Sequence, residues 1–382
     1  MTFFAKRYNI KDAVNRIPDL VRTVVYWHVE EEAKFVAQGP PHDPGPPSDY
    51  LAELSTTRTA LIAGNSDIKI VLVGFSSDPI WGGAYLANKT TIPPYSGVNT
   101  GDIEAFETNR LEPWLAAHDL YDVADFHSYE QSYVLRGKAD YMRAKIGSTP
   151  EALWAFEAGG PYFSSATVTG FPTAIGYTDA TNAWFVFANM TEALTNGVAR
   201  YAWELYEPGA DNDVQDQAFK NTALYRGVPG VDLLVPKLSR YAYEKLANNI
   251  TRFVSAFDER ILLTPTRVSD TNAIFNSRFM FDPATSTTQV NLLWTGTLAN
   301  QTVTLHVATA NTTVSMTVMH AENPTYVQFV TLVGDSCTFV LTREPILVAC
   351  NAEFRVAANG VSVGPTAISE DHGTLAPLVA RV

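Results

Sequence analysis

Almost continuously apolar runs alternate with helical stretches over the first two thirds of the chain, and this alternation restricts the fold more than any other feature. Five runs have the composition of buried strands, and stretches of helical periodicity separate them. Strands that are apolar on both faces and are joined through helices form parallel sheets covered by helices. An α/β fold is therefore predicted for residues 1–254, with strands at 23–29, 68–75, 123–129, 152–157 and 199–206.

Helices are predicted where apolar residues recur every three or four positions. Ser48 has the side chain of a good N-cap for one of them. The stretch from Ser76 to Thr100, which is rich in glycine and aromatic residues, is expected to be an irregular excursion. The predicted helices cover residues 9–20, 49–64, 102–118, 132–147, 180–196 and 236–253.

The pattern changes after residue 254 to short β-rich runs separated by turn residues. This spacing predicts an antiparallel β-sandwich over residues 255–355. Residues 356–382 carry few large apolar side chains, so a poorly ordered tail is expected there. Cys337 and Cys350 flank a short connection. In a hairpin they would lie nearly opposite one another, which fits a cross-strand disulfide and two buried thiols equally well.

The composition limits the partners. The chain has 382 residues and a net charge of −13, which argues against nucleic acid and anionic membranes. No apolar run reaches the length of about 18 residues that a membrane span needs. The two cysteines lack metal-ligand spacing, and no metal or organic cofactor is implied.

Five N-x-[ST] sequons stand at Asn88, Asn189, Asn249, Asn300 and Asn311. Their number favours a secreted glycoprotein. The first residues do not lead into the apolar segment of a signal peptide. We therefore expect the signal to lie upstream of this chain.

Polar and aromatic side chains stand at the ends of four predicted strands. Glu157 follows the strand Leu-Trp-Ala-Phe and precedes Gly-Gly-Pro, and Glu30–Glu32 follow another strand. His127 and Tyr129 end a third strand, and Trp203 lies near the end of a fourth. Parallel α/β barrels place their catalytic groups at these strand ends. Two carboxyl groups across a cleft, one protonated and one ionised, cleave glycosidic bonds.

These segments resemble motifs of clan A glycoside hydrolases. Tyr26–Ala33 resembles the Y-W-E-x-x-N-E-P segment of strand 4 of that clan, and Lys69–Phe75 resembles its V-V-L-G-G strand 5. Ala124–Tyr129 is similar to the D-x-x-x-x-H-x-Y strand 6, and Leu153–Pro161 to the W-x-x-E-x-G-G-P strand 7. The resemblance covers about residues 5–255, and the sandwich is similar to the small β-domain that follows many of these barrels.

The resemblance implies a role for each matching residue. Glu32 matches the acid/base and Glu157 the nucleophile, while His127 and Tyr129 match residues that line the nucleophile's side of the pocket. Trp203 stands where the clan often has a sugar-stacking aromatic residue. The implied activity is retaining hydrolysis of β-linked sugars, with a carbohydrate as the partner.

Two departures from the clan pattern affect this interpretation. Glu31 stands at the substrate-binding position where the clan has asparagine, and Ala33 replaces its proline. An ionised Glu31 only accepts hydrogen bonds, and it would repel Glu157. Glu31 and Glu32 both stay open as the acid. A catalytically inactive carbohydrate-binding relative is the alternative, as is a sugar- or partner-binding module centred on the sandwich.

The second departure concerns the barrel. Residues 23–29 match strand 4, so the chain has no counterpart of strands 1 to 3, and five strands do not close a barrel of eight. We therefore expect a partial TIM barrel, strands 4 to 8, with an open sheet. The usual length of βα units suggests that roughly 100 residues precede this chain.

Overall fold

The computed structural model describes the chain in segments that form two compact units. The first unit contains Met1–Ser128, Gly137–Glu157 and Val198–Ala202, and the second contains Tyr129–Arg136, Ala158–Gly197 and Trp203–Val382. The domain boundary predicted at residue 254 stays a prediction. The described residues are 1–9, 11–16, 18, 23–29, 32–33, 46–89, 92, 100–130, 132–147, 152–160, 179–203, 224–228, 231–250, 253–259, 261–262, 273–282, 289–295, 300–307, 313–318, 328–331, 336–341, 345–358 and 361–363.

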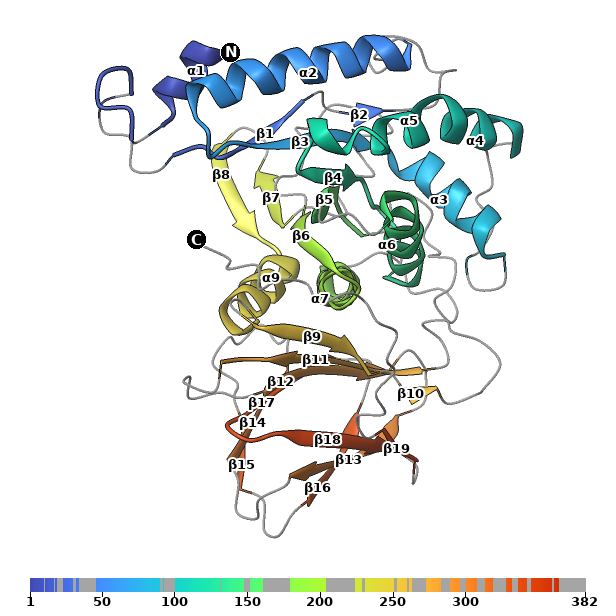
Figure 1. Ribbon diagram of the computed structural model, residues 1–382. Helices are drawn as coiled ribbons and strands as arrows, with labels where there is room; N and C mark the ends of the chain where they lie inside the picture. Colours follow the sequence, from blue (N-terminus) through green and yellow to red (C-terminus); the bar gives the residue numbers. More distant parts are fainter. Residues whose placement is uncertain are drawn as a thin grey trace. The chain divides into compact units, whose positions relative to one another are not determined.

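An open sheet forms the centre of the first unit (Figure 1). Its strands run in the order β1-β3-β4-β5-β6, and β2 pairs with β3. The pairs β1–β3, β2–β3, β3–β4 and β4–β5 are parallel. The predicted partial barrel is confirmed, because the described strands form a parallel half-barrel whose order runs from β1 to β6. The strands are β1 (Tyr26–His28), β2 (Glu32–Ala33), β3 (Lys69–Phe75), β4 (Val123–Phe126), β5 (Ala152–Ala158) and β6 (Val198–Trp203).

The sheet is strongly curved. Tyr26 on β1 and Trp154 on β5 have ring centroids 4.8 Å apart, although β3 and β4 lie between these strands in the sheet. The Arg200 guanidinium on β6 lies over both rings, 4.4 Å from the Tyr26 centroid and 4.7 Å from that of Trp154. Val71 and Val123 pack in the same cluster as Trp154. The concave side of the half-barrel is thus filled in part by its own side chains.

Asp122 fixes the start of β4 against β3. Its Oδ2 accepts hydrogen bonds from the Ile70 amide and the Arg58 guanidinium, both at 2.9 Å, and its Oδ1 accepts one from Lys69 Nζ at 3.1 Å. Burial raises the pKa of Asp122, but the amide and the two cations outweigh burial and hold the pKa below its ordinary value. The ionised form is therefore the one that the fold stabilises.

We expect Asp122→Asn to lower the free energy of unfolding at pH 7. A carboxyl group with a depressed pKa contributes stability above its unfolded pKa of about 4, and the contribution disappears as the pH falls through the folded pKa. The difference from wild type should therefore shrink below pH ~4. Urea unfolding at pH 7 and pH 3 measures it, with the exposed Asp119→Asn as the control. A difference that is the same at both pH values would contradict the expectation.

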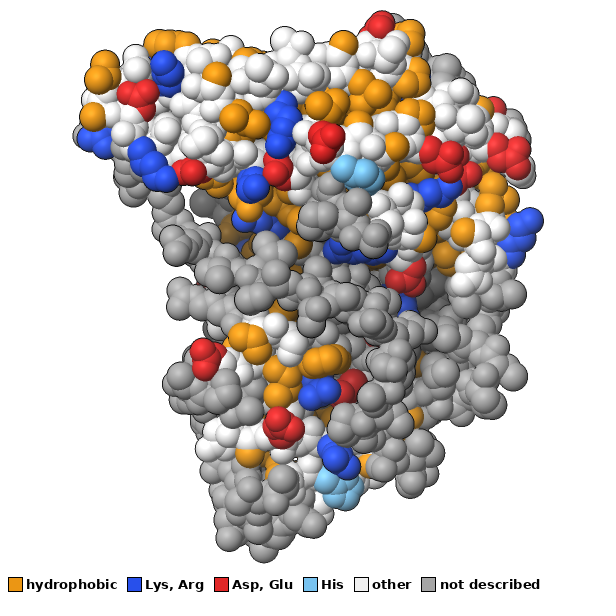
Figure 2. All heavy atoms as spheres, viewed as in Figure 1, with side chains coloured by type: hydrophobic (Ala, Val, Ile, Leu, Met, Phe, Trp, Pro, Cys, Tyr) orange, Lys and Arg blue, Asp and Glu red, His pale blue; other side chains and the backbone are white. Residues whose placement is uncertain are grey.

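The helices of the first unit match the prediction in part. The predicted helices at 49–64 and 132–147 are present as α2 and α6, and the stretch predicted at 102–118 is divided into α4, the π-helical turn η2, α5 and the 3₁₀ turn η3. On the face in Figure 2, acidic and basic side chains of the described residues are interspersed over this unit. The bounds are α2 (Pro47–Gly64), α3 (Ser77–Ala87), α4 (Thr100–Phe106), η2 (Glu107–Leu111), α5 (Glu112–Leu115), η3 (His118–Leu120) and α6 (Ser132–Ile146).

Three local predictions were wrong. No helix occupies the described residues between 9 and 20; α1 (Thr2–Arg7) precedes them, and Asp12 Oδ1 accepts hydrogen bonds from the amides of Val14 and Asn15. Such side-chain bonds compete with helix formation. Helix α2 begins after Pro46 and not after Ser48. Helix α3 lies where an irregular excursion was expected.

The described residues of the second unit include two large antiparallel sheets and the helices α7 and α9. One sheet has the order β10-β11-β12-β17-β14-β15 with β9 on β11, the other has the order β16-β13-β18-β19, and β7 and β8 form a separate pair. The bounds are α7 (Asp179–Thr195), β7 (Tyr225–Val228), β8 (Val231–Pro236), α9 (Leu238–Asn249), β9 (Ser255–Asp258), β10 (Ile261–Leu262), β11 (Ala273–Met280), β12 (Gln289–Thr295), β13 (Gln301–Val307), β14 (Thr313–Val318), β15 (Gln328–Thr331), β16 (Ser336–Leu341), β17 (Ile346–Cys350), β18 (Phe354–Ala358) and β19 (Val361–Val363).

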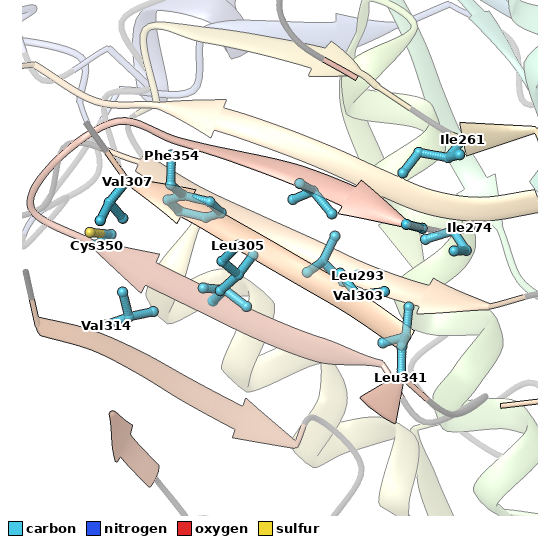
Figure 3. Packing of buried hydrophobic residues seen from close by; sticks show 13 residues of the cluster. Ile261, Ile274, Leu293, Val303, Leu305, Val307, Val314, Leu341, Cys350 and Phe354 are labelled. Atoms are coloured by element: carbon cyan, nitrogen blue, oxygen red, sulfur yellow. The ribbon is translucent and has the colours of Figure 1, made fainter. Parts of the chain in front are cut away.

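Both sheets contribute to one hydrophobic core, the arrangement predicted for a β-sandwich (Figure 3). Leu293 and Val314 come from the larger sheet, and Val303, Leu305 and Phe354 come from the smaller one. The opposite face of the larger sheet is also buried. Its Trp294 stacks on Phe275 with centroids 4.7 Å apart and meets Trp184 of α7 edge-on at 6.4 Å. Helix α7 also packs against α9, β9 and β11, so it belongs to the second unit together with the sandwich.

Two further predictions on the sandwich need correction. The strands β18 and β19 continue past residue 355, so regular structure extends into the predicted tail as far as Val363. Cys337 and Cys350 do not face each other in a hairpin, because β16 pairs with β13 whereas β17 pairs with β12 and β14. Both cysteines are free thiols, and burial raises the pKa of each.

Candidate active site

Backbone hydrogen bonds join the carboxyl ends of β3, β4 and β5. The His127 amide donates to the Phe75 carbonyl at 2.8 Å, and the Ser128 amide donates to the Glu157 carbonyl at 3.0 Å. The ends of three parallel strands are therefore held together, as the α/β pattern predicts. His127 and Glu157 lie at this edge.

Glu157 and His127 face each other at the edge. The Glu157 side chain is 41% exposed, and its Oε2 lies 3.6 Å from Nδ1 of His127, whose side chain is only 2% exposed. This separation is longer than an ordinary hydrogen bond and places the imidazole beside the carboxylate. A carboxylate that is open to solvent and backed by a buried imidazole is suited to attack a bound electrophile.

Asp125 supports the strand end just before Glu157. It is fully buried on β4, and its Oδ1 accepts a hydrogen bond from the Phe156 amide at 2.9 Å. Its Oδ2 lies 3.2 Å from Nε2 of His28 on β1. The sequence interpretation missed Asp125 and His28. For Asp125 the signal was its place as a charged residue inside the apolar run Val123–Phe126. Carboxylates are almost never fully buried without partners.

Glu32 is described through its backbone only. In strand β2 it pairs with Gly74, Gly74 pairs with Asp125, and Asp125 pairs with Trp154. Glu32 therefore lies on the same row of the sheet as Trp154. Trp154 in turn stands three residues before Glu157 on β5. The Glu32 side chain and the whole of Glu31 lie outside the described residues, so their roles stay predictions.

Tyr129 and Trp203 belong to the second unit. Both are buried, each with 7% exposure. Tyr129 follows the first unit's Ser128, and Trp203 is the last residue of β6. Their predicted substrate contacts stay predictions.

The described residues include neither a metal-ligand cluster nor a membrane-spanning helix. Within these segments, no three His, Cys, Asp or Glu side chains lie together as a metal site requires. None of the described helices is long and apolar enough to cross a membrane.

Comparison with known proteins gave no match to any protein-family model or curated protein sequence. Among solved structures, the GH51 arabinofuranosidase from Xanthomonas axonopodis pv. citri is similar with a TM-score of 0.51 and 12% identity, over 91% of this chain and 72% of that one. The GH51 alpha-L-arabinofuranosidase from Thermotoga petrophila RKU-1 gives a TM-score of 0.46 at 12% identity, over 85% of this chain and 66% of that one. The GH86 beta-porphyranase from Bacteroides plebeius gives 0.48 at 12% identity, over 92% and 60%.

The chain thus shares its fold with the solved Xanthomonas enzyme, and its strand-end motifs had implied a fold of this kind. It spans between 60% and 72% of the lengths of these three similar structures. At 12% identity the likeness concerns the fold, and the chemistry has to be argued from the site.

Proposed function

We propose that this chain is a retaining glycoside hydrolase in which Glu157 is the nucleophile. The observation that supports the proposal is the position of Glu157: a carboxylate at the carboxyl end of a parallel strand, partly exposed, with the His127 imidazole 3.6 Å away. The attack on an anomeric carbon requires the ionised form of such a carboxylate.

The proposed reaction has two displacements. In the first, a Glu157 oxygen forms a bond to the anomeric carbon while the glycosidic bond breaks, and the acid/base donates its proton to the leaving oxygen. In the second, the same group takes a proton from water as the water oxygen displaces Glu157. We assign the acid/base role to Glu32, whose backbone lies on the row of Asp125 and Trp154. Retention predicts carboxyl groups about 5–5.5 Å apart.

The proposed substrates are β-linked sugars. The similar structure from Xanthomonas axonopodis is that of an arabinofuranosidase, so an arabinofuranoside belongs in the first substrate panel. The test is release of the aryl group from aryl β-glycosides and an aryl arabinofuranoside, with the configuration of the first-formed sugar followed by NMR. Net retention supports the proposal, and inversion of configuration contradicts it.

The rival is a carbohydrate-binding relative without activity, which the Glu31 substitution motivates. It predicts saturable sugar binding by the intact chain and no release of the aryl group from any member of the panel. Calorimetric titration with the same sugars distinguishes the two, because the rival requires binding without turnover.

We propose further that the protein is secreted and N-glycosylated. Its sequons differ in their exposure to solvent. Asn300 and Thr302 are both exposed, whereas Asn189 is fully buried and its Nδ2 donates to the carbonyls of Glu130 and Gly159 at 2.8 and 3.0 Å. In protein secreted from a eukaryotic host, we expect glycan on Asn300 and none on Asn189. Mass spectrometry after enzymatic glycan release measures site occupancy. An occupied Asn189 in folded protein, or an empty Asn300, would contradict this expectation.

A further inference from the structure

Lys138 on α6 is a fully buried ammonium group that the proposed reaction does not use. Burying a cation is costly unless oxygen atoms receive its hydrogen bonds. Lys138 Nζ donates to the His127 carbonyl at 2.6 Å and to Ser77 Oγ at 2.8 Å, and it lies 5.7 Å from the centroid of the Phe126 ring. These partners come from the segment after β4 and the first turn of α3, so Lys138 joins the carboxyl ends of β3 and β4.

The carbonyl that Lys138 holds belongs to the peptide group between His127 and Ser128. The N–H of this same peptide group donates to the Glu157 carbonyl at 3.0 Å. A chain of hydrogen bonds therefore runs from the ammonium through one peptide group to Glu157. Hydrogen bonds in such chains polarise and strengthen one another, most of all when the first donor is charged.

We propose that Lys138 is a positioning residue for Glu157. Through the His127–Ser128 peptide group it fixes the main chain of Glu157, and it also fixes the residue whose imidazole faces the Glu157 carboxylate. The role in catalysis rests on the proposed function. The hydrogen-bond chain itself does not, so the two are tested separately.

The substitution Lys138→Met keeps the length of the side chain and removes its donors and charge. We expect the Ser128 amide to exchange with solvent deuterium at least tenfold faster than in wild type, because its peptide group loses the charged partner. If the chain is an active glycosidase, kcat should fall at least tenfold while KM stays within twofold. The geometry of the carboxylate changes, but the sugar-binding contacts do not.

Lys145→Met is the matched control. Lys145 lies on the same helix but pairs with Glu107 and Glu112, at 2.9 and 2.7 Å, and its side chain is 26% exposed. Ser128 exchange, kcat and KM should stay within twofold of wild type in this variant. Equal acceleration of Ser128 exchange in both variants would overturn the proposal, because it would indicate a general loosening of α6.

An unchanged Ser128 exchange rate in Lys138→Met also overturns the proposal. If wild type hydrolyses no glycoside while Lys138→Met still accelerates Ser128 exchange, the positioning role stands and the proposed function fails. If Lys138→Met does not fold, Ser77→Ala removes one acceptor of the same ammonium group. Ser128 exchange at least threefold faster than in wild type is then expected, and an unchanged rate overturns the proposal.

Discussion

Glu157→Gln is expected to reduce glycoside hydrolysis by on the order of 10³-fold or more, because an amide does not replace a carboxylate as a nucleophile. Glutamine keeps the size of the side chain and does not disturb the Ser128–Glu157 backbone hydrogen bond. The loss should therefore fall on kcat, without a loss of stability. Initial rates on the best substrate of the panel, together with the melting temperature, measure both quantities.

Glu53→Gln is the control for this substitution. Glu53 is an exposed carboxylate on α2 of the same unit. Its replacement should leave kcat and the melting temperature unchanged. A Glu157→Gln variant that keeps more than a tenth of the wild-type rate would exclude Glu157 as the nucleophile.

Trp114→Ala is expected to destabilise the first unit by about 3–5 kcal/mol, the range for deleting a large aromatic side chain from a core. Trp114 is fully buried on α5. Its ring lies 4.5 Å from that of Tyr50 on α2 and 6.0 Å from that of Phe75 on β3, and its Nε1 donates to the Pro47 carbonyl at 3.3 Å. The substitution opens a cavity where α2 and α5 meet β3.

Urea unfolding followed by circular dichroism measures the change in the free energy of unfolding. Phe3→Ala removes an aromatic ring that is 59% exposed, so it should cost less than about 1 kcal/mol. If the two substitutions destabilise the protein equally, Trp114 is not a centre of the core.

The sequence predicted β3 and β4 of the half-barrel well because their burial is nearly continuous. All six residues from Ile70 to Phe75 are buried, and so is the whole of β4, so the apolar runs mark these strands directly. The end of β5 could be identified from its apolar sequence, although Phe156 is exposed. Its apolar run leads directly to Glu157, and the polar residue after such a run marks the edge where the candidate site lies.

Helix α3 was missed because its glycines resemble turn signals. In the structure Gly82 and Gly83 are buried inside the helix. A Cβ atom at Gly82 would collide with Ile103, and one at Gly83 with Tyr141. These glycines serve close packing and not a turn, a difference that depends on tertiary contacts which local sequence does not show.

In the sandwich, too, local sequence does not show the tertiary contacts that decide which strands pair. Cys337 and Cys350 are close in sequence, but Cys337 lies on β16 of the smaller sheet and Cys350 on β17 of the larger one. Strand spacing predicts that sheets form but does not assign each strand to a sheet. Asp125 and His28 were missed for a related reason, since their proximity arises only when β1 and β4 lie in one curved sheet.

The central claim is that Glu157 is the nucleophile of a retaining hydrolase. Its most direct test is incubation of the intact chain with a 2-deoxy-2-fluoro glycoside of the sugar that it hydrolyses best, followed by peptide mass spectrometry. We predict one covalently bound fluoroglycosyl group, on the peptide that contains Glu157 and on the carboxylate of that residue. Hydrolysis with the label on another carboxylate, or with no covalent label at all, would contradict the claim.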